Sequence, residues 1–459
     1  MSQEPSGGAT PNLLYGLQDR PPFFPSVLAA IQHILACLVA IVTPTLIIGS
    51  ALGLGELTPY LVSMSLIASG VGTYVQARRI GPVGSGLLSV QGTSFSFVGA
   101  ITAAGLVAKN RGDSPEQMLA LIFGLCLAGS VVEMGVSQFV EKLKRIITPT
   151  VTGIVIMVIG LSLLEVAFTD LIGGVGTTDA GSPVNLGVGL LVVIVIVALS
   201  FHKSASVRLS AILLGLLVGS AVGAFFGMFD ISALGTQALI TVPIPLRFGL
   251  SFDFALFLPI AFIYLITAIE AAGDLTATSI ISGQPVQGEI YMRRIRAGIL
   301  GDSLNSTFAA LLNAFPSTTF SQNNGVIQLT GVASRHVGLY IAAILIVLGL
   351  FPVVGGAFTI LPKPVIGGAM LILFGSITVA GIRVIAARPI TRKAIYVMAL
   401  SFGFGLGVAL VPEAISGLPD FLQKTVGSPI IVAGLVAIFT TLVLPEDEPI
   451  SGADKAAAD

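Results

Sequence analysis

The chain has 459 residues, of which 54% are hydrophobic and only 10% are charged, and its formal net charge is −1. Soluble domains carry about 25% charged residues, so this composition excludes a water-soluble globular protein and predicts a chain that faces lipid. Cys37 and Cys126 lie in apolar runs without a partner motif, which excludes a disulfide framework and a zinc site.

Fourteen apolar runs have roughly the length that crosses a bilayer. We place them at residues 26–50, 59–75, 84–106, 116–139, 148–169, 185–201, 208–228, 253–280, 296–314, 316–332, 337–361, 364–386, 393–411 and 427–445. The first run is too long for the apolar region of a cleavable signal peptide. The pattern therefore predicts an all-α polytopic membrane protein.

The basic residues predict the orientation of these spans. With both termini inside, five of the 22 Lys and Arg residues fall outside, and the other seventeen fall inside. The five are Lys109, Arg111, Arg247, Lys363 and Lys424. This bias follows the positive-inside rule and supports an even number of spans.

Spans five and twelve share a pattern of proline and glycine residues. Pro149, Gly153 and Gly160 match Pro364, Gly368 and Gly375 at a constant offset of 215 residues. Spans five and twelve are seven apart, so the match indicates two halves of seven spans, the second of them inverted. Inverted repeats are common in transporters, although two apolar helices can also resemble each other by chance.

Two spans contain polar, glycine-interrupted sequence at membrane depth. Span three includes residues 89–97, and span ten includes residues 316–331; both are rich in hydroxyl and amide side chains. Non-helical backbone survives in a bilayer only where protein or a cavity surrounds it. Paired interruptions of this kind indicate a transporter's substrate site, and the alternative is polar contact between helices.

Acidic residues deep in the predicted spans are the next candidates. Glu270 and Asp274 are four residues apart in span eight and share one helix face, and Asp302 lies in span nine. Such carboxyls usually line a polar cavity, pair or relay protons, although each could instead cap a neighbouring helix. His33 in span one is as consistent with a structural contact between helices as with function. Three other glutamates lie near predicted span ends, where we expect them to reach water: Glu133, Glu141 and Glu165.

The run from Gln322 to Gly331 resembles the signature of the nucleobase–ascorbate transporters, and every fixed position of that signature matches. Glu270, Asp274, Asp302 and His33 fit the same context, and the resemblance covers the whole chain. Within the family, the segments from Ser321 to Arg335 and from Asp19 to Pro22 look like those of bacterial xanthine permeases.

The resemblance implies a core domain of spans 1–4 and 8–11 that moves against a gate domain of spans 5–7 and 12–14. The expected boundaries are an N-terminal tail at 1–25, core segments at 26–139 and 253–361, gate segments at 140–252 and 362–445, and a C-terminal tail at 446–459. It further implies a homodimer in the bacterial inner membrane that takes up a purine together with protons, with both tails cytoplasmic.

The resemblance also assigns roles to individual residues. Glu270 and Gln322 would hydrogen-bond the base, and Asn323 would shape the broken span. Asp274, Asp302 and His33 would support the site and the coupling. A neutral oxopurine presents N–H donors beside carbonyl acceptors, which a carboxylate and an amide can bind together. Phe95 or Phe320 could stack on the ring.

Two positions bear on the substrate. Uracil carriers of the family have Glu at the position of Gln322 and His at the position of Asp274, so uracil is the weaker reading. Xanthine-selective members commonly have Asn at the position of Ser94, which admits urate or a dual specificity. Guanine is a further alternative substrate.

The rival readings come from other protein classes. An anion exchanger can share the fourteen-span inverted fold, but would be expected to lack the pair of Glu270 and Gln322. A membrane enzyme would need a metal-ligand spacing or a nucleophile–base pair, and neither stands out. We therefore expect no enzyme activity, no cofactor, no metal and no nucleic-acid partner, with a small purine, protons and lipid as the partners.

Overall fold

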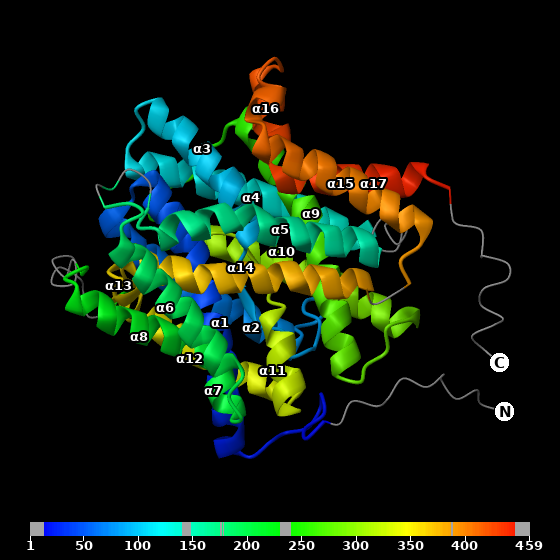
Figure 1. Cartoon of the computed structure of the whole chain (residues 1–459). Helices are drawn as coiled ribbons and strands as arrows, with labels where there is room; N and C mark the ends of the chain where they lie inside the picture. The colour runs from blue at the N-terminus through cyan, green and yellow to red at the C-terminus, as the bar shows by residue number, and fades with distance from the viewer. Residues whose placement is uncertain are drawn as a thin grey trace.

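The computed structural model describes residues 13–139, 148–174, 177, 179–229, 240–386 and 389–445, so most of the two predicted tails and Glu141 lie outside the described residues. The chain is mostly helical (Figure 1). The helices of the first half are α1 (Phe23–Leu52), α2 (Thr58–Arg78), α3 (Val98–Asn110), α4 (Pro115–Phe139), α5 (Pro149–Leu171), α6 (Pro183–Ser200), α7 (Ala205–Leu209) and α8 (Ala211–Phe225). Those of the second half are α9 (Phe254–Ile281), α10 (Gly288–Leu311), α11 (Gln322–Thr330), α12 (Arg335–Gly349), α13 (Pro352–Thr359), α14 (Lys363–Ala386), α15 (Arg392–Leu410), α16 (Asp420–Val426) and α17 (Pro429–Val443).

The helices pack in two sets that are each discontinuous in sequence. In one set, α2 packs on α1, α10, α12 and α13, and α4 packs on α9 and α10. In the other, α14 packs on α5, α6 and α8, while α17 packs on α5 and α15. α9 contacts both sets through α5 and α17, so its residues can lie at the boundary between them.

An extensive contact between two helices joins α5 to α14, which run side by side in Figure 1. A Cβ atom at Gly153 would lie 2.7 Å from the Gly381 carbonyl oxygen, and one at Gly381 would lie 2.6 Å from the Gly153 oxygen. Gly160 is equally close to the backbone of α14, at 2.7 Å from the Phe374 oxygen. Glycine is needed here because it lets two membrane helices approach until their backbones touch.

The two polar segments identified in the sequence form short strands that pair side by side, and we call this strand pair the strand crossing. β1 (Gln91–Thr93) pairs with β2 (Ser317–Thr319) in an antiparallel register that sets Gly92 opposite Thr318. Neighbouring helices hold both strands: Thr73 Oγ1 accepts a hydrogen bond from the Gln91 N–H at 2.9 Å, and Ser306 Oγ accepts one from the Ser317 N–H at 3.1 Å. The strands thus exchange backbone hydrogen bonds that water cannot supply at this depth.

A half-helix follows each strand. β1 leads through a short 3₁₀ turn (Phe95–Phe97) into α3, and β2 leads through Ser321 into α11. Because the strands are antiparallel and adjacent, the N-terminal ends of both half-helices lie near the crossing. Helix N-terminal ends carry partial positive charge and unpaired N–H groups.

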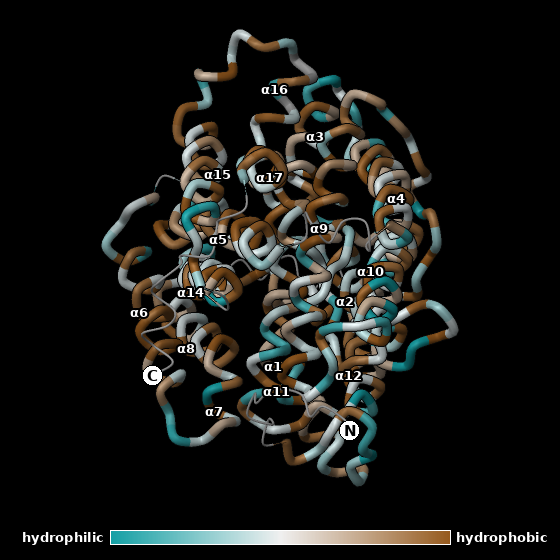
Figure 2. The backbone as a smooth tube through the Cα atoms, turned by 90° about the vertical axis from the view of Figure 1, so that its right-hand side faces the viewer, coloured by the Kyte–Doolittle hydropathy of each residue, from teal (hydrophilic) through white to brown (hydrophobic). Residues whose placement is uncertain are grey.

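Seven helices of the described residues are long and apolar enough to cross a membrane, and eight if a bent pair counts as one. Exposed Leu186, Leu190 and Ile194 line the outer side of α6, whose tube is mostly hydrophobic in Figure 2. The count of fourteen spans stays a prediction, because α3, α8 and α17 are shorter apolar helices.

The predicted span at 337–361 differs from the observed structure. It consists of α12 and α13, which meet at an angle of 76°. Pro352 is the first residue of α13, and a proline ring there removes a backbone donor and disfavours helical backbone in the preceding residue. Hydropathy alone does not register such a break.

Candidate functional site

The two carboxyls on α9 each meet one half-helix end. Ser96, in the turn before α3, donates a hydrogen bond to Glu270 Oε2 at 2.8 Å. Ser321, directly before α11, donates to Asp274 Oδ1 at 2.5 Å, and Thr319 donates to Asp274 Oδ2 at 3.2 Å. Glu270 and Asp274 are four residues apart on α9, and this spacing lets one reach the N-terminal end of α3 and the other the N-terminal end of α11.

These two acids also differ in burial. Asp274 is 4% exposed and has donors on both oxygens, whereas Glu270 is only half-buried. Glu270 is thus held in place by Ser96 while part of its side chain stays accessible. A carboxyl with this combination is suited to accepting N–H groups from a ligand.

Asn323 and Asn324 fix α11 to the helices around it. Asn323 Nδ2 donates to the Leu88 carbonyl oxygen at 2.6 Å, and Asn324 Oδ1 accepts from Thr278 at 2.7 Å. His33 of α1 is fully buried and faces Asn323, although neither ring nitrogen forms a hydrogen bond with the described residues. The structure therefore places His33 behind the broken span.

Asp302 lies in α10 behind the strand pair. It is fully buried and faces Gln91 of β1 and Thr318 of β2. Within the described residues, neither of its oxygens reaches hydrogen-bond geometry with a donor. Asp302 is thus a buried acid next to the strand crossing, in surroundings unlike those of Asp274.

Glu133 is the residue for which the prediction was wrong. We expected it to reach water near a span end, but it is 1% exposed within the helix packing and close enough to Asp302 and Glu270 to interact electrostatically. Its position on α4 predicts burial only if the neighbouring helices are known, and α4 packs on both α9 and α10. Glu165, in contrast, is exposed as predicted.

The remaining predicted residues lie around the same crossing. Ser94 is buried, and its Oγ accepts a hydrogen bond from the Ser96 N–H at 3.3 Å. Phe95 is 6% exposed, and Phe320 packs against Gly92, where a Cβ would lie 2.4 Å from the ring. Gln322 is the half-buried first residue of α11, and no hydrogen bond joins it to Glu270 among the described groups.

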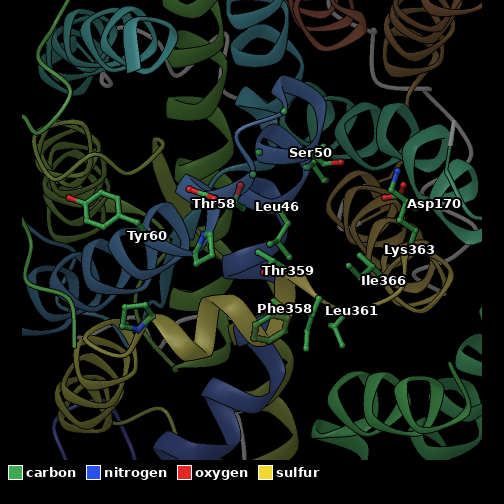
Figure 3. A pocket seen from close by; sticks show the side chains of 18 of the residues that line it. Leu46, Ser50, Thr58, Tyr60, Asp170, Phe358, Thr359, Leu361, Lys363 and Ile366 are labelled. Atoms are coloured by element: carbon green, nitrogen blue, oxygen red, sulfur yellow. The ribbon is translucent and has the colours of Figure 1, made fainter. Parts of the chain in front are cut away.

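A cavity of about 1060 Å³ opens between the two sets of helices (Figure 3). Leu46 and Ser50 of α1 line one side and Ile366 of α14 lines the other, while Asp170 and Lys363 lie close together at its edge. Its volume far exceeds that of one small heterocycle, so it has the size of a vestibule and not of a fitted pocket.

The side of α14 that lines this cavity also leads to the strand crossing. Ile366 and Met370 line the cavity, and Phe374 lies one further turn along the same face. Phe374 contacts Phe95 edge to face, with ring centroids 5.2 Å apart. Phe95 directly precedes Ser96, which bonds Glu270, so this face of α14 connects the cavity lining to the turn that holds Glu270.

The side chains around the strand pair are of the kinds that bind small polar rings. The described residues contain no group of three or more His, Cys, Asp or Glu side chains that could hold a metal ion. They do bring together a half-accessible carboxyl, an adjacent amide and aromatic rings. A carboxylate accepts N–H groups, and an amide both donates and accepts.

The sequence matches the model of a family described as "Permease family" over residues 24–414. It is 45% identical over 438 residues to the xanthine permease XanQ of Escherichia coli K12, covering 95% of this chain and 94% of that protein. It is 43% identical to the xanthine permease XanP of the same strain, covering 95% of each chain. The uric acid-xanthine permease of Emericella nidulans is 33% identical, over 96% of this chain and 84% of that protein.

Two solved structures share the fold at low sequence identity. The transmembrane domain of the cyanobacterial bicarbonate transporter BicA superposes with a TM-score of 0.54 at 15% identity, over 93% of this chain and 99% of that one. The structure of SLC26A9 gives a TM-score of 0.61 at 13% identity, over 91% of this chain and 65% of that one.

Proposed function

Because the chain belongs to the nucleobase–ascorbate transporter family and is a nucleobase permease of the membrane, we propose that it carries xanthine into the cell together with protons. The observation that carries this proposal is the pair of α9 carboxyls at the two half-helix ends. We infer xanthine as the substrate because two relatives are named xanthine permeases.

The site chemistry fits an oxopurine. Glu270 accepts adjacent N–H groups of the base, and Gln322 pairs with a neighbouring carbonyl and N–H. The N-terminal ends of α3 and α11 stabilise negative charge that builds up on the ring oxygens. Phe95 and Phe320 bracket the ring face, and Asp274 holds α11 in place through Ser321.

Transport by this chain requires the site to face each side of the membrane in turn. We assign the set containing α1–α4 and α9–α13 to a core domain and the set containing α5–α8 and α14–α17 to a gate domain. Rocking of one set against the other closes the cavity near Asp170 and Lys363 and opens a path from the site to the opposite side of the membrane. Transporters built from inverted repeats work in this way. The basic-residue bias places this cavity outside and both termini in the cytoplasm, and we expect two copies to form a dimer.

Urate is the second candidate substrate, and a specific observation favours it. Ser94 is small, buried and adjacent to the turn that holds Glu270, and one relative is a uric acid-xanthine permease. A dual specificity for xanthine and urate is therefore the alternative to xanthine alone.

The test is uptake of labelled xanthine, urate and uracil in cells that lack their own nucleobase permeases. We expect xanthine uptake to rise as the external pH falls and to collapse when a protonophore dissipates the gradient. Uptake that resists the protonophore, or that requires sodium, would refute proton coupling. Uptake of uracil without xanthine would refute the substrate assignment.

A further inference from the structure

The four buried carboxyls of this region fall into two groups by their surroundings. Glu270 and Asp274 receive hydroxyl donors and lie at half-helix ends. Glu133 and Asp302 lie inside α4 and α10, and in the described part of the chain neither is bonded to a residue of the two half-helix ends. Within the described residues, Glu133 Oε1 and both oxygens of Asp302 are buried without a hydrogen-bond partner.

Contacts between α4 and α10 bring Glu133 and Asp302 to the same level. The hydroxyls of Ser130 and Thr307 are 2.8 Å apart, and farther along the two antiparallel helices Arg296 donates a hydrogen bond to Gln138. Glu133 lies between the two α4 contacts, and Asp302 lies between the two α10 contacts. The two carboxyls therefore lie at the same level of this helix pair, close enough to interact electrostatically.

Among the described residues, no basic group forms an ion pair with either of these two acids. Arg111–Asp253 is the ion pair found among the described residues, and neither Glu133 nor Asp302 takes part in one. The titratable groups that face Glu133 are Asp302 on α10 together with Glu270 and Tyr264 on α9; the Tyr264 hydroxyl is already committed to the Cys126 carbonyl oxygen at 2.9 Å. Gln91 and Thr318 are the donors beside Asp302, but no ion pair offsets either acid in the described part of the chain, and two neighbouring buried carboxylates would carry a desolvation cost of several kcal/mol each.

We propose that Glu133 shares a proton with Asp302 during the transport cycle. It acts through Asp302 and does not touch the substrate. A proton bound to one carboxyl removes one of the two negative charges, and the resulting O–H can donate to the remaining carboxylate. Asp302 in turn faces Gln91 and Thr318 on the two strands, so a change in the proton on this pair alters the hydrogen bonding of the strand crossing. This inference rests on the proposed proton-coupled uptake.

Glu133→Gln tests the proposal, because the amide keeps the size of the side chain but cannot gain or lose a proton. Purified protein would be reconstituted into liposomes and assayed in three ways. These are xanthine binding by calorimetry, xanthine exchange without a pH gradient, and accumulation driven by an imposed pH gradient. Glu116→Gln is the matched control, since Glu116 is an exposed acid in the first turn of the same helix.

We expect Glu133→Gln to bind and exchange xanthine within about twofold of the native protein. Gradient-driven accumulation should fall by at least about tenfold, or the pH profile of uptake should move by about one unit, which is a tenfold change in proton affinity. Glu116→Gln should match the native protein in all three assays.

Two outcomes would overturn the proposal. One is unchanged accumulation with an unchanged pH profile; the other is a parallel fall in binding, exchange and thermal stability, which marks a structural role. If Glu133→Gln does not fold, Glu133→Ala replaces it because alanine cannot hold a proton either, and unchanged accumulation with an unaltered pH profile in that variant counts equally against the proposal. Native protein that shows no gradient-driven xanthine uptake would refute the proposed function itself.

Discussion

Replacing Glu270 by Gln isolates the charge of one carboxyl at the strand crossing. The Gln side chain has nearly the same shape, and its carbonyl oxygen can still accept the hydrogen bond that Ser96 donates at 2.8 Å. The packing of α9 is therefore preserved. What changes is that one accepting oxygen becomes an NH₂ group, which cannot accept the N–H groups of a purine.

The magnitude follows from the strength of a hydrogen bond to a charged group, about 1.5–3 kcal/mol. Loss of that bond weakens xanthine binding by about tenfold to a hundredfold. Asp274 should not compensate, because Ser321 and Thr319 already occupy its two oxygens and it is 4% exposed.

The assay is calorimetric titration of purified protein with xanthine, with Glu165→Gln as the control because Glu165 is an exposed acid on α5. Thermal unfolding of both variants would show that the fold is retained. Native affinity in Glu270→Gln would refute the reasoning and assign Glu270 a structural role.

Three further outcomes follow from the structure. Ser94→Asn should suppress competition by urate against labelled xanthine uptake by about 1–3 kcal/mol, or roughly five- to hundredfold, while sparing xanthine; no competition by urate in the native protein would contradict this. Gly153→Ala should lower the thermal unfolding temperature, because its Cβ would meet a backbone oxygen at 2.7 Å and overpacking costs about 1–3 kcal/mol. Gly375→Ala should not, because nothing lies within 4 Å of that Cβ, and equal effects would refute the argument. Burial alone would raise the pKa of Asp253, but hydrogen bonds from Arg111 and from backbone N–H groups lower it; Arg111→Ala should therefore destabilise the protein slightly, and only above about pH 4, as pH-dependent thermal unfolding would reveal.

The match between Gly153 and Gly368 shows what a sequence pattern can predict and what it cannot. The two glycines occupy corresponding places in the predicted repeat, yet Gly153 packs on the backbone of α14 and Gly368 on the backbone of α6. The pattern indicates close packing at both positions. Which helix is the partner depends on how the two halves are placed together.

The broken spans were identifiable in the sequence because polar, glycine-containing stretches are exceptional at membrane depth. Residues 89–97 and 316–331 therefore predicted interrupted backbone, and the lengths and charges of the other runs predicted a polytopic membrane protein. Glu270, Asp274 and Asp302 were identified in the same way, because carboxyls are costly in a bilayer. The Gln322 to Gly331 run then indicated the family, which the comparisons confirm.

Composition and hydropathy thus determined the protein class, the Gln322 to Gly331 run indicated the family, and a few costly residues predicted the region of the site. The tertiary structure decided which groups meet: the register of β1 on β2, the separate hydroxyl partners of Glu270 and Asp274, and the burial of Glu133 against Asp302. The physical reason is that burial and hydrogen bonding depend on side chains from helices far apart in the sequence. A sequence pattern identifies which face of a helix is polar or closely packed, but only the tertiary structure shows which residues that face contacts.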